Sequence, residues 1–194
     1  MTPEINNKEN GFTLAEVLTV AFIIAIISLI AFTSYRQSGF QLALNRSASK
    51  LAQDLRMAEQ MAMGASVCPT GSPCAGQISP GYGINLNLGN TNYGLYSDKN
   101  NDQDYDPSGD DQIETLNLEK RIIIEKIYKF PIGGSSEEEA AEFSINFKPP
   151  DPEVKLSCNG ADLNDYVRIV LALESNPTIT KTVRVNRFGL IEVE

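Results

Sequence analysis

The sequence predicts an α+β fold in which a long N-terminal helix packs on an antiparallel β-sheet. Between residues 12 and 63, an apolar run is followed by apolar residues that recur at helical spacing. Beyond Gly64 the pattern changes to short segments in which apolar and polar residues alternate. Gly, Pro, Asn and Asp separate these segments, which is typical of strands joined by turns.

Composition limits the functions open to the chain. Its 194 residues include no His and carry a formal charge of −9. Without His, every His-based triad, His-ligated zinc site and His acid–base mechanism is excluded. The negative charge argues against a protein that binds nucleic acid through a general basic surface.

The run Val17–Phe32 contains no charged residue. A helix of about 21 residues, counted from Phe12, is ~31 Å long and matches the hydrocarbon layer of a membrane. A buried core helix is one alternative, but a domain of this size rarely hides a helix that is apolar on every side. A cleaved secretory signal is another, but it would not begin with an acid after a polar segment. We therefore predict a single membrane-spanning helix.

Glu16 is the one charge near the start of this run. A lone carboxylate in apolar surroundings costs several kcal/mol unless it is paired or hydrated. It therefore lies at the level of the lipid headgroups or meets a positive partner. The nearest candidate partner is a free α-amino group, which exists only if the chain is cut just before Phe12.

The block GFTLAE at residues 11–16, followed by the apolar run, resembles the class III signal of type IV pilins and pseudopilins. The resemblance implies that a membrane aspartyl peptidase, the prepilin peptidase, cleaves between Gly11 and Phe12. It implies that Phe12 then becomes the N-methylated first residue. Glu16 would be the carboxylate that this family retains for assembly.

Some residues depart from the pattern of major pilins. Lys8 is the only base of the leader, and Ala25 and Thr33 stand where many major pilins have glycine and proline. These departures favour a minor pilin or a pseudopilin. The closing segment Val183–Val193 resembles the end of the H-type minor pseudopilins of type II secretion and of related minor type IV pilins.

The resemblance implies a pilin-like fold with four parts. Residues 1–11 are a cleaved leader, and residues 12–35 are a transmembrane helix that later lies in the filament core. Residues 36–63 are an amphipathic continuation of the helix, and residues 64–194 are a β-rich globular domain. An apolar stripe on the continuation predicts a face packed on sheet, and Gly64 predicts its end. The stripe consists of Leu44, Ala48, Leu51, Leu55, Ala58 and Ala62.

Eight segments of the globular domain are predicted to be strands. They are Tyr82–Leu88, Tyr93–Tyr96, Gln112–Leu118, Ile122–Phe130, Glu142–Phe147, Tyr166–Leu173, Thr182–Arg187 and Leu190–Val193. Glu137–Ala141 is expected to form one helical turn.

Cys68 and Cys74 flank a short loop rich in Pro, Gly and Ser. We predict a disulfide between them, because the globular domain would lie outside the inner membrane, where oxidation can occur. Cys158 is expected to be a buried thiol, with a pairing to one of the other two as the alternative. The lack of His and of a second close pair argues against zinc.

Residues 98–111 hold six carboxylates and one base. Oxygen-bearing side chains alternate here as in a calcium loop. Gln103 and Gly109 occupy the places of the turn glycine and the bidentate Glu, so the segment is no EF-hand. An irregular calcium site is one interpretation, and a solvated acidic connection between strands is the other. The candidate ligands are Asp98, Asn100, Asp102, Asp104, Asp106, Asp110 and Asp111.

These features favour a structural subunit rather than an enzyme, since no acid is expected in an apolar pocket that would raise its pKa for catalysis. By resemblance, its partners are other pilins or pseudopilins, the prepilin peptidase, the inner-membrane assembly platform and, before assembly, the lipid bilayer. It would move from the inner membrane into a periplasmic pseudopilus or a surface pilus. The alternatives are a membrane-anchored calcium-binding domain and a DNA-uptake minor pilin. Lys181, Arg184 and Arg187 are the only candidate basic strip, and nucleic acid is not expected to bind.

Overall fold

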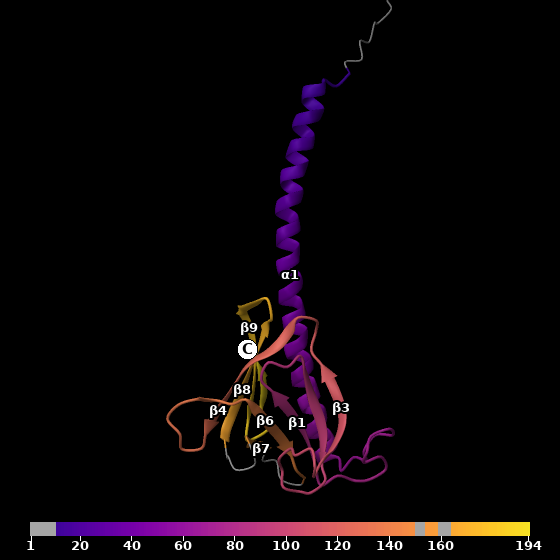
Figure 1. The fold of residues 1–194 in the computed structure, drawn as a ribbon, viewed down its shortest axis with the longest axis vertical. Helices are drawn as coiled ribbons and strands as arrows, with labels where there is room; N and C mark the ends of the chain where they lie inside the picture. The colour runs from indigo at the N-terminus through magenta and orange to yellow at the C-terminus, as the bar shows by residue number, and fades with distance from the viewer. Residues whose placement is uncertain (1–10, 150–153, 159–163) are drawn as a thin grey trace, which may run out of the picture. The chain divides into compact units, whose positions relative to one another are not determined.

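The computed structural model describes the backbone of residues 11–149, 154–158 and 164–194, together with their side chains except those of 30–38. The predicted leader therefore lies mostly outside the described residues. Contacts divide the chain into two compact units, Met1–Phe40 and Gln41–Glu194. One helix, α1 (Leu14–Met63), contributes residues to both units (Figure 1).

In the second unit, α1 buries one face. All six residues of the predicted stripe are at most 2% exposed, which confirms this part of the sequence analysis. The helix ends at Met63, where the N–H of Ser66 donates to the carbonyl of Met61 at 2.9 Å. The left-handed residue of this turn is Ala65, with φ 44°, and not Gly64, the residue expected to end the helix.

Two antiparallel five-stranded sheets make up the rest of the second unit (Figure 1). The first has the order β3-β2-β1-β6-β7 and the second the order β10-β9-β8-β4-β5. The strands of the first sheet are β1 (Gly81–Asn87), β2 (Asn92–Asp98), β3 (Asp111–Asn117), β6 (Glu142–Phe147) and β7 (Val154–Ser157). The strands of the second sheet are β4 (Ile122–Pro131), β5 (Glu138–Glu139), β8 (Asn164–Leu173), β9 (Asn176–Asn186) and β10 (Ile191–Val193).

The α+β class and the eight predicted strands are confirmed, with shifted ends. The helical turn expected at Glu137–Ala141 is wrong, because Glu138 and Glu139 form β5 and pair with Lys129 and Tyr128 of β4. Lys129 also forms an ion pair with Glu138 at 3.6 Å. A short run of Glu and Ala looks helical by local propensity, and pairing with a neighbouring strand overrides it. The sequence analysis missed β7.

Polar bonds join the C-terminal part of α1 to both sheets. Lys50 donates to the carbonyl of Asn117 at the end of β3 (2.8 Å), and Arg56 donates to that of Ile191 in β10 (3.1 Å). The hydroxyl of Tyr93 in β2 donates to Asp54 at 2.6 Å. Burial raises the pKa of Tyr93, and the Asp54 carboxylate raises it further, so the phenol stays a donor. The helix therefore closes the core over both sheets.

Candidate functional site

The start of α1 is held by a capping box. The N–H of Thr13 donates to Glu16 Oε2, and the N–H of Glu16 donates to Thr13 Oγ1, each at 3.3 Å. The carboxylate predicted to serve assembly thus already has a structural partner in the single chain. The sequence analysis missed this role, although the T-x-x-E spacing of residues 13–16 signals it.

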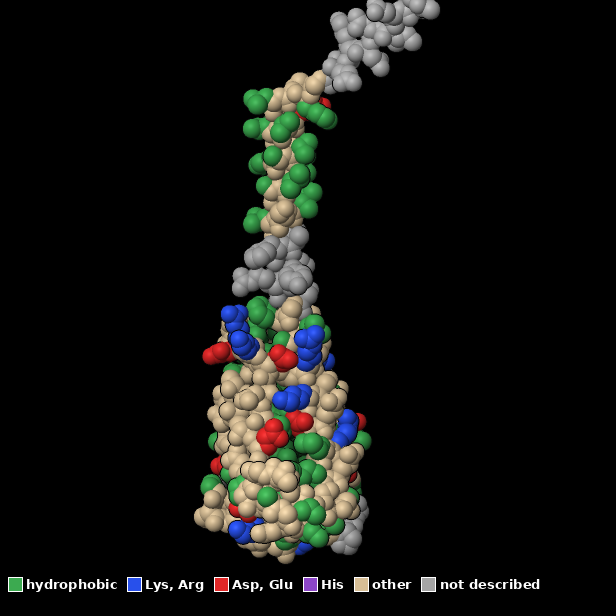
Figure 2. All heavy atoms as spheres, turned by 90° about the vertical axis from the view of Figure 1, so that its right-hand side faces the viewer, with side chains coloured by type: hydrophobic (Ala, Val, Ile, Leu, Met, Phe, Trp, Pro, Cys, Tyr) green, Lys and Arg blue, Asp and Glu red, His purple; other side chains and the backbone are tan. Residues whose placement is uncertain are grey.

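Every large apolar side chain from Phe12 to Leu29 is exposed, by 45–87% of its surface. Figure 2 shows hydrophobic side chains projecting from the visible side of this segment. An exposed apolar surface of this extent marks a contact with other molecules. In the described part of the chain, no helix combines the length and the apolar character that a membrane crossing requires.

The acidic loop begins at Asp98, which is fully buried. Its Oδ1 accepts the N–H of Asn101 at 2.7 Å, and its Oδ2 accepts the N–H of Gln103 at 3.1 Å. Asn101 and Gln103 both have a left-handed backbone, with φ 66° and 65°. The chain therefore turns at Gln103, where a calcium loop has glycine. Burial raises the pKa of Asp98, and the two amide bonds oppose that shift.

Asp110 closes the other end of the loop. Its two oxygens accept the N–H groups of Lys99 and Asp106, each at 3.0 Å. Burial raises the pKa of this carboxyl to about 6, because the two amide bonds only partly offset the loss of hydration. Asp98 and Asp110 thus accept hydrogen bonds from the loop's own backbone, and Asp98 Oδ2 also accepts one from Asn146 Nδ2 at 3.3 Å.

The middle of the loop is crosslinked by Asn100. Its Nδ2 donates to Asp102 at 2.8 Å and to Asp106 at 3.1 Å. Asp106 also accepts the hydroxyl of Ser108 and the N–H groups of Ser108 and Gly109. These bonds, with that of the Ser108 hydroxyl the most important, hold the pKa of Asp106 below the usual range. The amide nitrogen of Asn100 therefore lies between these two carboxylates.

The loop lies across the strands β6 and β7. The N–H of Tyr105 donates a hydrogen bond to Ser144 Oγ in β6 at 3.2 Å. From β7, Ser157 donates to Asp104 at 2.8 Å and Lys155 donates to the carbonyl of Asp102 at 2.7 Å. These bonds fix the loop against one face of the first sheet, which we call the outer face because α1 packs on the other.

The remaining predicted ligand points elsewhere. Asp111 forms an ion pair with Lys99 at 3.5 Å. Within the described residues, no three Asp, Glu or Cys side chains are grouped closely enough to hold a metal ion. Among the seven predicted ligands, Asn100, Asp102 and Asp106 approach one another through the hydrogen bonds of the Asn100 amide.

Two tyrosines attach the loop to the sheet. The rings of Tyr96 and Tyr105 lie 5.0 Å apart, and the hydroxyl of Tyr96 accepts a bond from Asn146 at 3.2 Å. Tyr96 can lie on the sheet because its cross-strand partner is Gly83. A Cβ at Gly83 would stand 2.5 Å from the Tyr96 ring, so this strand position needs glycine.

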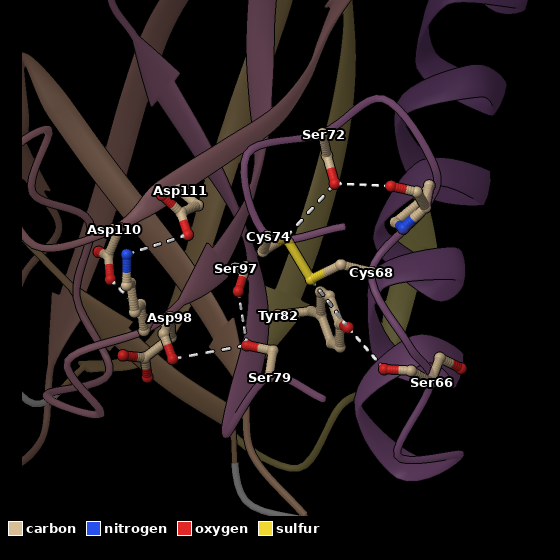
Figure 3. The surroundings of a disulfide bond; sticks show 12 residues. Ser66, Cys68, Ser72, Cys74, Ser79, Tyr82, Ser97, Asp98, Asp110 and Asp111 are labelled. Atoms are coloured by element: carbon tan, nitrogen blue, oxygen red, sulfur yellow. Dashed lines mark hydrogen bonds and ion pairs between the residues drawn. A yellow bond between two sulfur atoms is a disulfide. The ribbon is translucent and has the colours of Figure 1, made fainter. Parts of the chain in front are cut away.

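Cys68 and Cys74 are joined by a disulfide, with their Cα atoms 5.6 Å apart (Figure 3). Tyr82 of β1 lies beside it, 3.6 Å from Cys68 Sγ, and its hydroxyl donates to the carbonyl of Ser66 at 2.6 Å. The disulfide closes the loop that follows α1, and the hydrogen bond from Tyr82 holds that loop on the first sheet. Cys158 lies outside this disulfide and is half-buried rather than buried.

The candidate basic strip is broken up. Arg184 lies over the ring of Tyr166 at 4.2 Å. Arg187 lies over the ring of Phe188 and pairs with Asp165 at 3.5 Å. Neighbours within the fold therefore engage both arginines.

Residues 6–32 match the prokaryotic N-terminal methylation motif. The matched segment contains Gly11, Phe12 and Glu16, the residues on which the resemblance to pilins depends. None of the curated proteins and none of the solved structures compared with the chain matches it. The chain therefore carries the class III signal that is found in type IV pilins and pseudopilins.

Proposed function

We propose that this chain, which carries the N-terminal methylation motif of pilins, is a minor pilin or pseudopilin. It is a structural subunit that prepilin peptidase cuts between Gly11 and Phe12 and methylates at Phe12. It then assembles with other pilins into a helical filament. The observation that carries the proposal is the motif match at residues 6–32. A pilin-type subunit is usually not an enzyme.

The exposed apolar side chains of residues 12–29 support this function. They lie on all sides of a helix, so no single neighbouring surface within one chain could cover them. Lipid would cover them before assembly, and the equivalent helices of other subunits would cover them in the filament. Both environments remove apolar surface from water, and this gain in free energy would drive membrane insertion and then filament assembly.

Cleavage is tested directly by mass spectrometry of the mature chain. Full-length protein is expressed with and without a prepilin peptidase. The processed chain should begin at Phe12 and carry one additional methyl group. The Gly11→Val variant should keep its leader, and a wild-type chain that keeps its leader in the presence of the peptidase would contradict the proposal.

Two substitutions at Glu16 separate assembly from helix capping. Glu16→Gln keeps a side chain that can complete the capping box but removes the charge, whereas Glu16→Ala removes both. If the carboxylate pairs with an N-terminal amine in the filament, both variants should insert and be cleaved, and both should fail to enter filaments. Normal incorporation of Glu16→Gln would reject the ion pair and leave Glu16 as a cap alone.

The choice between a secretion pseudopilus and a surface pilus rests on the C-terminal segment. The resemblance of Val183–Val193 to the H-type proteins favours a type II secretion pseudopilus over a surface pilus. Deleting the gene distinguishes the two uses, since the first predicts loss of a secreted enzyme and the second predicts loss of surface fibres. Periplasmic accumulation of the secreted enzyme with intact fibres is the expected result.

Calcium binding by the acidic loop stays a prediction. Its support is the left-handed turn at Gln103 and the close approach of Asp102 and Asp106 across Asn100. To bind calcium, the Asn100 amide would have to turn so that its oxygen faces the cation. The melting temperature of the full chain with and without calcium tests this prediction.

A further inference from the structure

A cavity of about 290 Å³ lies on the outer face of the first sheet, beside the acidic loop. Its walls come from β1, β2, β3 and Tyr105 of the loop. Its size is close to the lower end of the range for small-molecule sites. None of the residues that line it is charged, and most carry an amide or a hydroxyl. They include Asn85, Asn87, Asn92, Tyr105, Gln112 and Thr115.

Asn85, which lines this cavity, carries a hydrogen-bond acceptor that the described residues leave unused. It is 5% exposed, and its Nδ2 donates to Glu142 at 3.3 Å. Its Oδ1 is buried and accepts no hydrogen bond from any described residue. A buried acceptor that is left unpaired costs ~1–3 kcal/mol, so a small rotation of the Asn85 amide toward a ligand donor would recover that cost.

Tyr105 forms a rigid aromatic wall. Its ring packs on Tyr96, its N–H is bonded to Ser144, and its hydroxyl lies 3.5 Å from Gln112 Oε1. Burial raises the pKa of the Tyr105 phenol, so the hydroxyl remains neutral and can both donate and accept. An aromatic ring beside amide groups presents an apolar face and hydrogen-bonding edges together.

Gly94 leaves space in the sheet within the cavity. A Cβ added there would meet nothing closer than Gln112 Nε2, at 3.5 Å. The glycine is therefore not required by packing, in contrast to Gly83 on the next strand. Its missing side chain leaves room for an occupant.

We propose that this cavity binds one neutral sugar residue, a hexose or an N-acetylhexosamine, of a glycan. Such a ligand carries hydroxyls that both donate and accept, and a C–H face that can pack on Tyr105. Glu142 and the acidic loop disfavour an anionic ligand. The lining has no carboxylate to hold a cation and too little apolar surface for a lipid or an apolar side chain.

Saturation-transfer difference NMR on the full chain tests the proposal. The chain is held in lauryldimethylamine oxide micelles, because this detergent has no sugar headgroup. The probes are glucose, galactose, mannose, N-acetylglucosamine and N-acetylgalactosamine, with N-acetylneuraminic acid as the anionic comparison. At least one neutral sugar should show saturation transfer, and the anionic sugar should show at least tenfold less.

Gly94→Val places an isopropyl group inside the cavity, where it would compete with an occupant, and should reduce the signal at least tenfold. Asn85→Ala removes the unused acceptor and should reduce it at least threefold. Asn117→Ala, at an exposed position of β3 outside the cavity, is the matched control and should leave it unchanged. Thermal melting checks the fold of each variant, and Gly94→Ala replaces Gly94→Val if the larger side chain prevents folding. No transfer to any neutral sugar, equal transfer to the anionic one, or full transfer in a folded cavity-filling variant would overturn the proposal.

Discussion

The two sheets bury similar apolar cores but differ in what covers their outer faces. The first sheet is covered by the acidic loop, which buries Asp98 completely and seats Tyr105 on Tyr96. The second sheet carries paired cations and rings, with Arg168 lying 4.5 Å over Tyr128 and bonded to Glu137. On a covered face, each contact that a substitution removes leaves a buried group without a partner. On a half-exposed face, water can take the place of the lost contact. Substitutions should therefore be costly on the first sheet and mild on the second.

Gly83→Ala should have the largest effect. The new Cβ would stand 2.5 Å from the Tyr96 ring and would displace both tyrosines that seat the loop. We expect a loss of about 3 kcal/mol in the free energy of unfolding, measured by chemical denaturation of the full chain in detergent. Gly94→Ala, one strand away, is the control and should change that value by less than about 0.5 kcal/mol. Equal effects at both positions would remove the distinction between packed and open glycines.

Calcium would strengthen the cover of the first sheet if the prediction is correct. A single site stabilises the folded chain by about 2.7 kcal/mol at a hundredfold excess over its dissociation constant. The melting temperature of the full chain should rise with CaCl₂ and return with EDTA, and the Asp102→Asn variant should respond less. Identical melting in CaCl₂, MgCl₂ and EDTA would leave the loop as a connection held by its own hydrogen bonds.

Asp98→Ala should cost about 2 kcal/mol, because it leaves the N–H groups of Asn101 and Gln103 without their acceptor in a buried site. Asp98→Asn keeps one acceptor oxygen and should cost less. Hydrogen exchange at these two amides gives a local readout, and protection that survives in Asp98→Ala would contradict the account of the loop.

Arg168→Ala on the second sheet should cost below about 1 kcal/mol, since its ion pair with Glu137 is partly exposed. The same denaturation measurement applies, and Glu137→Gln is the matching change on the other partner. A loss as large as that of Gly83→Ala would show that the outer faces of the two sheets are equally demanding.

The two sheets should also respond to pH, and with opposite signs. The folded chain keeps a proton on Asp110 up to a pH of about 6, whereas an unfolded Asp releases it near pH 4. Stability should therefore fall as pH rises through this window, and Asp110→Asn should lose that part of the slope. The bond from Arg168 lowers the pKa of Glu137, so its contribution is present at neutral pH and disappears as pH falls below 4. Melting curves of wild type, Asp110→Asn and Glu137→Gln between pH 3 and 8 separate the two terms.

Local patterns predicted much of this fold. The spacing of the apolar stripe placed the buried face of α1, and alternation placed eight strands. The missing parts depend on contacts between distant residues. Glu138 and Glu139 become a strand only because β4 lies beside them. The burial of Asp98 depends on a loop that reaches Ser144 and Ser157, and no short window of sequence contains both ends of those contacts.

The candidate site shows the same division. The motif at residues 6–32 is local, and the sequence alone was enough to find it. The capping box of Thr13 and Glu16 is equally local, because both partners lie within one T-x-x-E segment. The cavity beside Tyr105 joins three strands and a loop, so only the structure brings its walls together.

The bonds that seat the acidic loop also set an order of folding. Ser144 and Ser157 lie 39 and 53 residues beyond their partners in the loop. Because the chain is synthesised from its N-terminus, β1, β2 and β3 can pair before β6 and β7 exist. The loop between β2 and β3 then still lacks the strands on which it lies. Closing such distant contacts is slow compared with local pairing. A protease site within residues 99–109 should thus stay open until β6 and β7 have docked, which makes the loop a marker of a completed domain.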